Sequence, residues 1–298
     1  MSSAETTKPQ SFFEKNHLLL RRLHSLTGIV PIGVFLIAHL VTNSSILWGK
    51  VGMRQAGHDM TMVQGGVTYF QKEVQWINEQ VPHLLLIEII LWTALAYHSI
   101  LGFYYARTGR TNVTSYAYQS NWRYTLQRIS GYIGILFIIY HIGTLRWGWT
   151  FLVPGGATWS HEFAASTLAL ALRGGEDFTA AGVAVSLFYL ICVSLLVFHF
   201  ANGLWTAAIT WGLTISQSAQ KRWGYVCAGL GAGLMLAAWS AVVGFATLSP
   251  AQARDFEKKY HEKYGGPAAV EKLGKPATGP SMNPSTSAVR ESVPVQGQ

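Results

Sequence analysis

The chain has 298 residues, of which 50% are hydrophobic and only 12% are charged, with a formal net charge of +8. A soluble globular chain is roughly one quarter charged, so this composition excludes an ordinary soluble domain and indicates a membrane protein. The basic residues stand at the ends of apolar runs, which is the positive-inside pattern of membrane proteins rather than a nucleic-acid-binding stripe. The two cysteines, Cys192 and Cys227, form no CxxC or CxxCH motif, which excludes covalent c-type haem.

The N-terminal part of the chain begins with a polar lead at residues 1–22. This lead lacks the apolar stretch of a signal peptide, so we expect it to be a cytoplasmic segment. The first apolar run, 23–48, is long enough to cross a bilayer. A polar loop follows, in which Val67, Phe70, Val74 and Ile77 recur at helical spacing. This spacing predicts a short helix on the membrane surface.

Four more apolar runs, at 82–106, 126–149, 180–215 and 223–248, complete a predicted five-helix transmembrane domain over 23–250. The segment HEFAASTLALALR, between the third and fourth of the five spans, is too short to cross, since a crossing takes ~20 apolar residues. After Pro250, ARDFEKKYHEKYG can form one polar helix. We expect the whole of 251–298 to be a polar tail, disordered where it is rich in Pro, Gly, Ser and Thr.

The orientation follows from the short loops that carry the basic residues. These loops precede the first span, join the second to the third and join the fourth to the fifth; their basic residues are Arg21, Arg22, Arg107, Arg110, Arg123, Lys221 and Arg222. Positive loops stay inside, so the N-terminus is predicted to be cytoplasmic. An odd number of spans then places the C-terminus outside.

Four histidines lie inside successive apolar runs, as FLIAHL (His39), LAYHSILG (His98), IIYHIG (His141) and VFHFANG (His199). A histidine in hydrocarbon is costly unless its ring is ligated or hydrogen-bonded. A single such residue would favour a helix-to-helix hydrogen bond. Four of them, one per span, predict two bis-histidine sites, and haem b is the group that takes two axial imidazoles inside a helix bundle.

Depth along the helices sorts these histidines into two levels. Counted from the cytoplasmic side, His39 is 13 residues past Leu26 and His141 is 13 past Arg128. Counted from the outer side, His98 is 16 residues past Pro82 and His199 is 17 past Gly182. At ~1.5 Å per residue, the first pair lies ~20 Å from the inside and the second ~25 Å from the outside. The predicted fold is therefore an all-α membrane protein, a five-transmembrane-helix bundle that encloses two haem b groups.

Other residues suit the surroundings of such haems. Gly28 and Gly134 precede His39 and His141 by whole helical turns, either to admit a flat ring or to allow close helix contact. Residues at the cytoplasmic ends of the spans are propionate partners or, equally, interfacial anchors: Arg22, His24, Ser25 and Trp122. We expect most of the histidines outside the spans to be solvated.

Glu88 is an acid in the outer third of the second span. An intramembrane carboxylate indicates function by default, so Glu88 is a candidate proton acceptor for a quinone beside the outer pair. Alternatively, it hydrogen-bonds a neighbouring helix. Asp59, Glu73 and Glu79 in the outer loop are weaker candidates for the same role.

Four segments carry a more specific pattern: FFEKNHLLLRRLHSLTGIVPIGVFLIAHLVTNSS, AYHSILGFYYARTG, NWRYTLQRISGYIGILFIIYHI and VFHFANGLWTAAITWGLTIS. Together and in this order, over about residues 12–245, they resemble the dihaem cytochrome b membrane-anchor subunits of succinate:menaquinone oxidoreductases and the related fumarate reductases. The resemblance implies that His98 and His199 bind the proximal haem and that His39 and His141 bind the distal haem. This pairing agrees with the depth argument.

The resemblance also implies partners and a location. The partners are a flavoprotein with FAD and the dicarboxylate site, and an iron–sulfur protein, both on the cytoplasmic side of a bacterial inner membrane. Electrons from succinate would pass through the two haems to menaquinone, with no catalytic dicarboxylate residue on this chain. Related fumarate reductases can carry a glutamate two residues before the fourth-span ligand, where this chain has Val197. That departure favours succinate oxidation.

Three alternatives stay open at this point. The first is the same anchor working in reverse, in a quinol:fumarate reductase. The second is a haem-free transporter that uses buried histidines as proton relays. The third is another dihaem anchor, such as that of a nitrate reductase or a hydrogenase.

Overall fold

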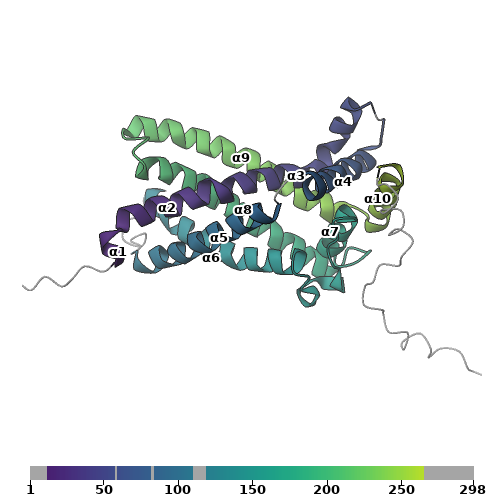
Figure 1. Ribbon diagram of the computed structural model, residues 1–298, viewed down its shortest axis with the longest axis horizontal. Coiled ribbons are helices and arrows are strands. Elements are labelled where there is room, and N and C mark those ends of the chain that lie inside the picture. Colours follow the sequence, from purple (N-terminus) through teal and green to yellow (C-terminus); the bar gives the residue numbers. More distant parts are fainter. Residues whose placement is uncertain (1–11, 58, 82–83, 110–118, 265–298) are drawn as a thin grey trace, which may run out of the picture.

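The computed structural model describes residues 12–264 apart from 58, 82–83 and 110–118, and within this part the chain is helical and has no strand (Figure 1). The elements in order are α1 (Phe12–Lys15), α2 (His17–Ile29), α3 (Pro31–Gln55), α4 (Met62–Gln80), α5 (Leu84–Thr108), α6 (Gln119–Leu145), η1 (Thr150–Leu152), η2 (Pro154–Gly156), α7 (Ala164–Arg173), α8 (Ala180–Thr210), α9 (Gln217–Thr247) and α10 (Pro250–Tyr264). α1 and α10 lie at opposite ends of an elongated bundle (Figure 1).

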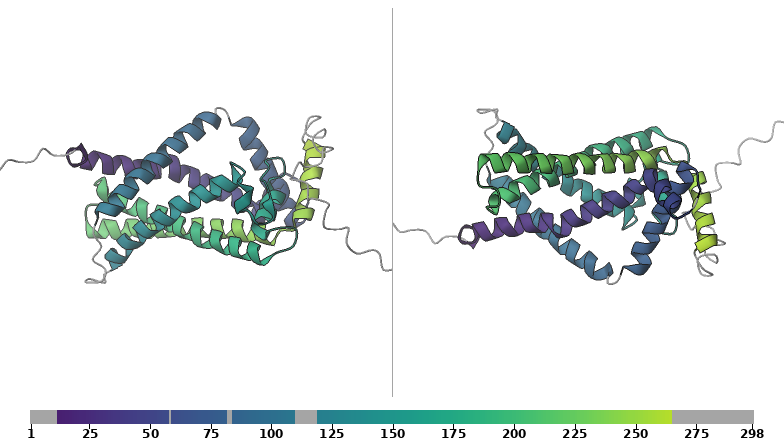
Figure 2. Two further views of the ribbon diagram at one scale, coloured as in Figure 1. Left: turned by 90° about the horizontal axis from the view of Figure 1, so that it is seen from below. Right: turned by 90° about the horizontal axis from the view of Figure 1, so that it is seen from above.

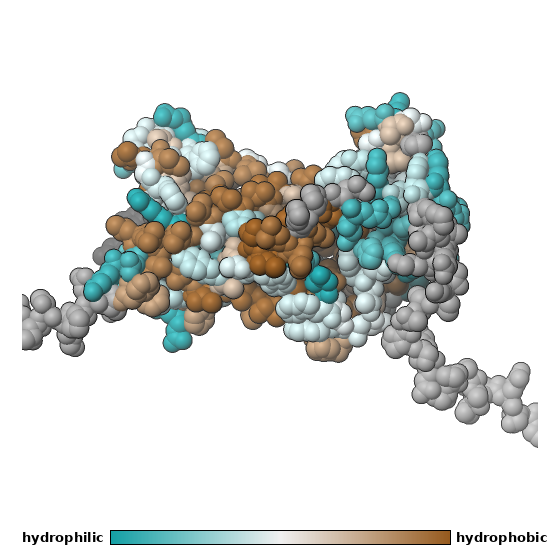
Figure 3. All heavy atoms as spheres, viewed as in Figure 1, coloured by the Kyte–Doolittle hydropathy of each residue, from teal (hydrophilic) through white to brown (hydrophobic). Residues whose placement is uncertain are grey.

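Within the described part of the chain, five segments are long and apolar enough to cross a membrane: His17–Gln55, Leu84–Thr108, Asn121–Leu145, Ala180–Thr210 and Gln217–Thr247. Each exceeds the ~20 residues that a bilayer core requires. Apolar side chains gather over the middle of the bundle and hydrophilic ones lie toward its ends (Figure 3). The prediction of an all-α, five-helix membrane protein is confirmed.

The first span is divided into α2 and α3 at Val30–Pro31. Val30 still donates its amide to the Leu26 carbonyl at 2.9 Å. Pro31 has no backbone N–H to continue the ladder, so it takes the first position of α3, where an N–H would lack a partner anyway. This break separates the level of His24 and Gly28 from that of His39.

Several span ends differ from the predicted ones. α6 ends at Leu145 and α8 at Thr210, before the predicted 149 and 215. The chain turns soon afterwards at Gly148 (φ 69°) and Gly212 (φ 74°), and left-handed glycines are frequent just beyond helix ends. α9 begins at Gln217, before the predicted 223, because the Ser216 hydroxyl accepts a hydrogen bond from the Ala219 amide at 3.2 Å and caps the helix.

An end cap of three helices, α4, α7 and α10, covers the end of the bundle opposite α1. The predicted loop helix is α4, with Val67, Phe70 and Val74 buried, and the short apolar segment is α7. The cap shares a core with α3 and α9: Ile46, Val67, Phe70, Val74, Ala164, Ala165, Ala169, Leu172, Ala241, Phe245, Ala246, Leu248 and Ala253. α10 runs across the bundle end rather than along it (Figure 2).

The expected polar tail over 251–298 begins with an ordered helix. Pro250–Tyr264 form α10, the polar helix that the sequence allowed, and this helix packs on α4 and α7. Four of its side chains after Pro250 are buried, namely Ala253, Glu257, Tyr260 and His261. The apolar patch that receives them is formed by distant segments, so the local sequence does not indicate the docking. Residues 265–298 lie outside the described residues.

Candidate haem sites

The four histidines of the apolar spans form two facing pairs, one pair at each of two levels of the bundle. His98 of α5 faces His199 of α8, with ring centroids 6.2 Å apart and ring planes at 79°. His39 of α3 faces His141 of α6, with centroids 5.8 Å apart and planes at 87°. These are the pairs that the depth argument groups together.

The separation within each pair suits a shared metal. A metal that binds two opposed imidazoles at ~2 Å each places the ring centroids ~6 Å apart. Among the described residues, no three or more His, Cys, Asp or Glu side chains gather to hold a bare metal ion. Two ligands per site therefore fit a metal that brings its other ligands with it, as the iron of a haem does.

The backbone fixes the tautomer of the pair nearer α1. His98 Nδ1 donates to the His24 carbonyl at 2.9 Å, and His199 Nδ1 donates to the Gln127 carbonyl at 3.0 Å. The Ser130 hydroxyl lies 3.2 Å from the same His199 nitrogen. A protonated Nδ1 leaves Nε2 as the basic nitrogen, which is the usual way in which a metal-ligating imidazole is oriented.

A polar network holds His199 between α6 and α8. The Gln127 amide donates to the His199 carbonyl at 3.1 Å and accepts from Asn202 Nδ2 at 2.8 Å. Asn202 accepts from Arg123 Nε at 2.9 Å, and the Arg123 guanidinium stacks on the Trp205 ring at 3.9 Å. These contacts are satisfied inside apolar surroundings, so they fix the relative rotation of the two helices.

The pair nearer the end cap has longer side-chain contacts instead. His39 Nδ1 lies 3.5 Å from Asn43 Nδ2, and His141 Nδ1 lies 3.4 Å from the Tyr189 hydroxyl. Phe35 stacks on the His39 ring, with centroids 5.3 Å apart. The surroundings of this pair are therefore aromatic and apolar.

Glycines at the α1-side pair give the distance between the two levels. A Cβ on Gly28 would lie 2.5 Å from His98 Cε1, and one on Gly131 would lie 3.1 Å from His199 Cε1. Gly28 precedes His39 by 11 residues and Gly131 precedes His141 by 10. At ~1.5 Å per residue, both helices place the two levels ~15 Å apart.

The two glycines singled out from the sequence have different surroundings. Gly28 lies against the His98 imidazole, and its predicted role in admitting a haem ring stays a prediction. Gly134 instead faces the Leu196 side chain, with 2.7 Å from an added Cβ to Cδ2, which is helix-to-helix contact. Gly131 was not identified from the sequence. It faces His199 of another helix, and no local sequence pattern indicates such a contact between distant segments.

The expected propionate residues are only partly gathered at the α1-side pair. His24 stacks on His98, with centroids 4.0 Å apart. The Ser25 hydroxyl accepts from Trp211 Nε1 at 2.9 Å, and Arg22 lies over the same indole at 5.7 Å. Trp122 is 51% exposed. Only His24 is thus in direct contact with a member of the pair.

Glu88 lies on α5, 10 residues before His98, and therefore ~15 Å toward the end cap, at the level of the His39–His141 pair. Both of its carboxylate oxygens lie 3.4 Å from Arg146 Nη2, just beyond the end of α6. The Glu88 side chain is 32% exposed. The stacked pair Trp92–Trp147 is adjacent, with centroids 5.6 Å apart.

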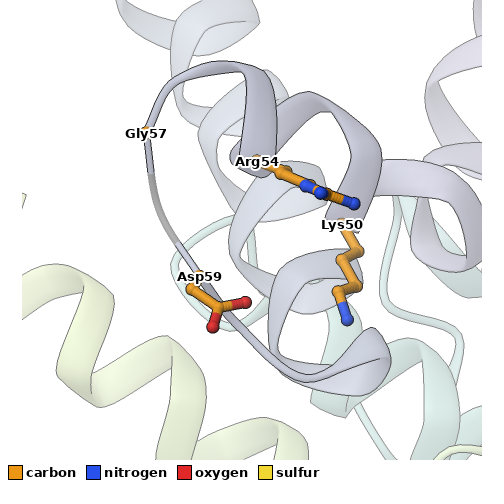
Figure 4. Close-up of a pocket in the computed structure, with 4 residues that line it drawn as sticks. All are labelled: Lys50, Arg54, Gly57 and Asp59. Atoms are coloured by element: carbon orange, nitrogen blue, oxygen red, sulfur yellow. The ribbon is translucent and has the colours of Figure 1, made fainter.

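A separate polar pocket of about 460 Å³ lies where α3 turns toward α4, lined by Lys50, Arg54, Gly57 and Asp59. Lys50 and Arg54 project from the last turns of α3, and Asp59 lies on the chain leading to α4 (Figure 4). The pocket is open and contains none of the four histidines.

Five apolar spans that carry two facing histidine pairs define the class of membrane-embedded cytochromes b. The chain is 32% identical over 207 residues to the succinate dehydrogenase cytochrome b558 subunit of Bacillus subtilis (strain 168), covering 69% of this chain and 86% of that protein. The chain therefore belongs to the family of succinate dehydrogenase cytochrome b subunits. No family model matches it, and no solved structure does.

Proposed function

We propose that this subunit holds two haem b groups, one on His98 and His199 and one on His39 and His141, and passes electrons from an iron–sulfur partner to menaquinone. Its membership of the family places it in succinate dehydrogenase, an oxidoreductase complex. The observation that carries the proposal is the presence of two facing imidazole pairs at two levels of one bundle. Bound haem b would supply one-electron redox chemistry within the apolar interior.

The chain's own residues orient the ligands and exclude water. The His24 and Gln127 carbonyls hold the α1-side imidazoles with Nε2 free. Phe35 and Phe137 stack on the cap-side imidazoles. Low polarity around the rings disfavours net charge at the site and so helps to set its potential.

The partners are proposed to dock at the α1 end. The basic residues there are accompanied by few acids, whereas those of the end cap stand among acids such as Glu73, Glu79 and Asp255. Loops with an excess of positive charge stay in the cytoplasm. A flavoprotein with FAD and an iron–sulfur protein would therefore approach the His98–His199 pair from inside, and the end cap would face outside. The dicarboxylate chemistry would belong to the flavoprotein.

Quinone reduction is proposed to take place at the level of the cap-side pair. Glu88 is at this level and partly exposed, with its carboxylate beside Arg146, so it is the candidate proton-transfer group. The sequence suggested a proton acceptor, the role that quinol oxidation requires, whereas in the direction of quinone reduction Glu88 would relay protons to the quinone. Glu73 of α4 is the second candidate, since its Oε2 is buried without a hydrogen-bond partner and burial raises its pKa. Replacing Glu88 by Gln should slow quinone turnover without loss of haem, whereas an equal effect of Glu73→Gln alone would favour the second site.

The direction proposed is succinate oxidation. Val197, where related fumarate reductases can carry a glutamate, is 1% exposed and packs with Leu40, Leu234 and Ala238. An apolar cluster at that position offers no group for proton transfer. A fumarate reductase working in reverse is the alternative, which the relative rates in the two directions would reveal.

The experiment is succinate-driven reduction of a menaquinone analogue by the purified complex. We expect His39→Ala to abolish quinone reduction while succinate oxidation by a soluble dye at the flavoprotein continues. The exposed His17, changed to Ala, is the matched control. Quinone reduction at the native rate in the His39→Ala complex would contradict the proposal, and a pure chain without any haem absorbance would favour the transporter alternative.

A further inference from the structure

The docked helix α10 buries an acid. Glu257 is 0% exposed and lies at the centre of the contact between α10 and α7. Its neighbours one turn away on the buried face are Ala253 and Tyr260, and the Tyr260 hydroxyl donates to Gln75 Oε1 of α4 at 2.7 Å. A fully buried carboxyl group is rare and indicates a specific role for its contacts.

All of the hydrogen bonds of Glu257 go to the first turn of α7. Oε1 accepts from the backbone amides of Ala165 (2.7 Å) and Ser166 (3.1 Å), and Oε2 accepts from the Ser166 hydroxyl (2.6 Å). These amides are among the groups that a helix leaves without partners at its N-terminus. Glu257 therefore caps α7 from a helix that lies 91 residues further along the chain.

α7 has no cap of its own. Phe163, at its N-cap position, makes no side-chain hydrogen bond to the helix. Gln71 of α4 supplies the remaining contact, since its Oε1 accepts from the Ala164 amide at 3.2 Å and its Nε2 donates to the His161 carbonyl at 2.8 Å. The start of α7 is thus held by side chains of α4 and α10, and release of α10 would leave two of its amides without an acceptor.

The protonation of Glu257 changes this contact. Burial raises its pKa to about 7, although the Ser166 hydroxyl, the two amides and the Arg254 charge act in the opposite direction. Once protonated, Oε2 can donate to Ser166 Oγ, whose own proton can turn to the Phe163 carbonyl at 3.4 Å. Both states of Glu257 thus have hydrogen-bond partners, but only the neutral one avoids a buried charge.

Few other charged or titratable groups face this carboxyl group. α10 contributes Arg254 one turn before it and His261 one turn after it. His261 Nε2 donates to the Glu162 carbonyl at 2.6 Å, which adds a second contact of α10 just before α7. α4 presents the uncharged amide of Gln71.

We propose that α10 is a pH-sensitive clasp, closed by the contact of Glu257 with the start of α7 and held more tightly when Glu257 is protonated than when it is ionised. Because the docked state binds the proton more strongly than the free helix does, docking weakens as the pH rises through the neutral range. The pKa of Glu257 rises from about 4.5 in the free helix to about 7 in the docked one. Linkage then requires the equilibrium constant for docking to fall roughly tenfold between about pH 6 and about pH 8.

The core on which α10 packs also contacts a neighbour of the cap-side histidines. Tyr189 packs against the core that the end cap shares with α3 and α9, and its hydroxyl lies 3.4 Å from His141 Nδ1. Opening of α10 would withdraw Ala253 and Phe256 from this core. This consequence concerns the proposed haem site, whereas the clasp itself does not depend on it.

Hydrogen exchange of the full chain in lipid nanodiscs tests the clasp. In the native protein, exchange protection of α10 and of the first turn of α7, corrected for intrinsic rates, should fall roughly tenfold from about pH 6 to about pH 8. Glu257→Gln cannot ionise and keeps an acceptor for the amides, so its protection should not change with pH. Glu257→Ala should lose protection in both segments at both values.

The matched control is Glu262→Gln, which changes an exposed acid on the same helix and should preserve the native pH response. If exchange protection in the native protein were as independent of pH as in Glu257→Gln, the proposed control of docking by Glu257 protonation would be wrong. Full protection in Glu257→Ala would overturn the clasp itself. Both readouts are independent of haem content, so they stand apart from the proposed electron transfer.

Discussion

At the scale of single residues, the space beside the imidazoles of the α1-side pair is provided by glycine. Gly28 and Gly131 approach the rings of His98 and His199 from neighbouring helices: an added Cβ would clash at 2.5 Å at Gly28 and would make a tight contact at 3.1 Å at Gly131. Other glycines of the spans, such as Gly233, have nothing within 4 Å of an added Cβ. The role of a glycine in this bundle therefore depends on what it faces.

Gly28→Ala should damage the α1-side site alone. Its Cβ would lie 2.5 Å from the His98 ring, so the ring or the helix must move. We expect the variant to lose one b-type component in redox titration while the other component keeps its native potential. Gly233→Ala is the control and should keep both; equal behaviour of the two variants would refute the assignment of Gly28 to the site.

Tyr189→Phe should act on the cap-side site. The hydroxyl lies 3.4 Å from His141 Nδ1, and removal of an outer partner of a ligand commonly weakens metal-site affinity about tenfold or more. Haem retention on dilution into detergent should therefore fall for one component only. Tyr140→Phe, whose hydroxyl donates to the Leu152 carbonyl at 3.3 Å, serves as the control and should retain haem normally.

The residues that the sequence revealed share one property, which is a polar group in an apolar run. This made His39, His98, His141 and His199 recognisable, and depth counting grouped them into the pairs that face each other. His261 and Glu257 lie in a polar stretch, and their burial depends on α4 and α7, far away in the sequence. Backbone partners, such as the Gln127 carbonyl, carry no residue identity at all and could not be predicted.

At the scale of elements, the end cap depends on side chains that bridge its helices. Gln71 is 1% exposed and joins α4 to the start of α7 through two hydrogen bonds. Amphipathic spacing predicted α4 as a helix on the membrane surface. It could not show that a second and a third short helix would pack on it.

Gln71→Leu should destabilise the cap by about 1–3 kcal/mol, because it leaves the buried Ala164 amide without a partner and removes the hydrogen bond to the His161 carbonyl. The free energy can be measured by SDS-induced unfolding in mixed micelles. The control is Lys72→Leu, which introduces leucine at the next, exposed position of α4 and should change the free energy of unfolding little. Equal stability of Gln71→Leu and the native chain would show that these two hydrogen bonds contribute nothing.

At the scale of the whole molecule, hydropathy and charge were sufficient for the architecture. Five runs of apolar residues became five spans, because each must satisfy its backbone hydrogen bonds within a helix in lipid. Span ends were less certain, since glycines and a serine cap beyond the apolar runs decide them. α1 and α10 lie at opposite ends of the bundle (Figure 1).

The proposed orientation can be tested with two single cysteines introduced at exposed positions, Ile215 near the α1 end and Gln252 in α10. A membrane-impermeant maleimide should label the first only in inverted vesicles and the second only in intact cells. The native Cys192 and Cys227 are buried and should give little background. The reverse pattern of labelling would place the end cap in the cytoplasm.

The central claim is that opposed imidazoles hold two separate haems in one five-helix bundle. A reduced-minus-oxidised spectrum, with haem counted per chain, measures this directly. We predict two b-type components in the native chain, with His98→Ala and His39→Ala each losing a different one. A single component that disappears in both variants, or full haem content in either, would contradict the account.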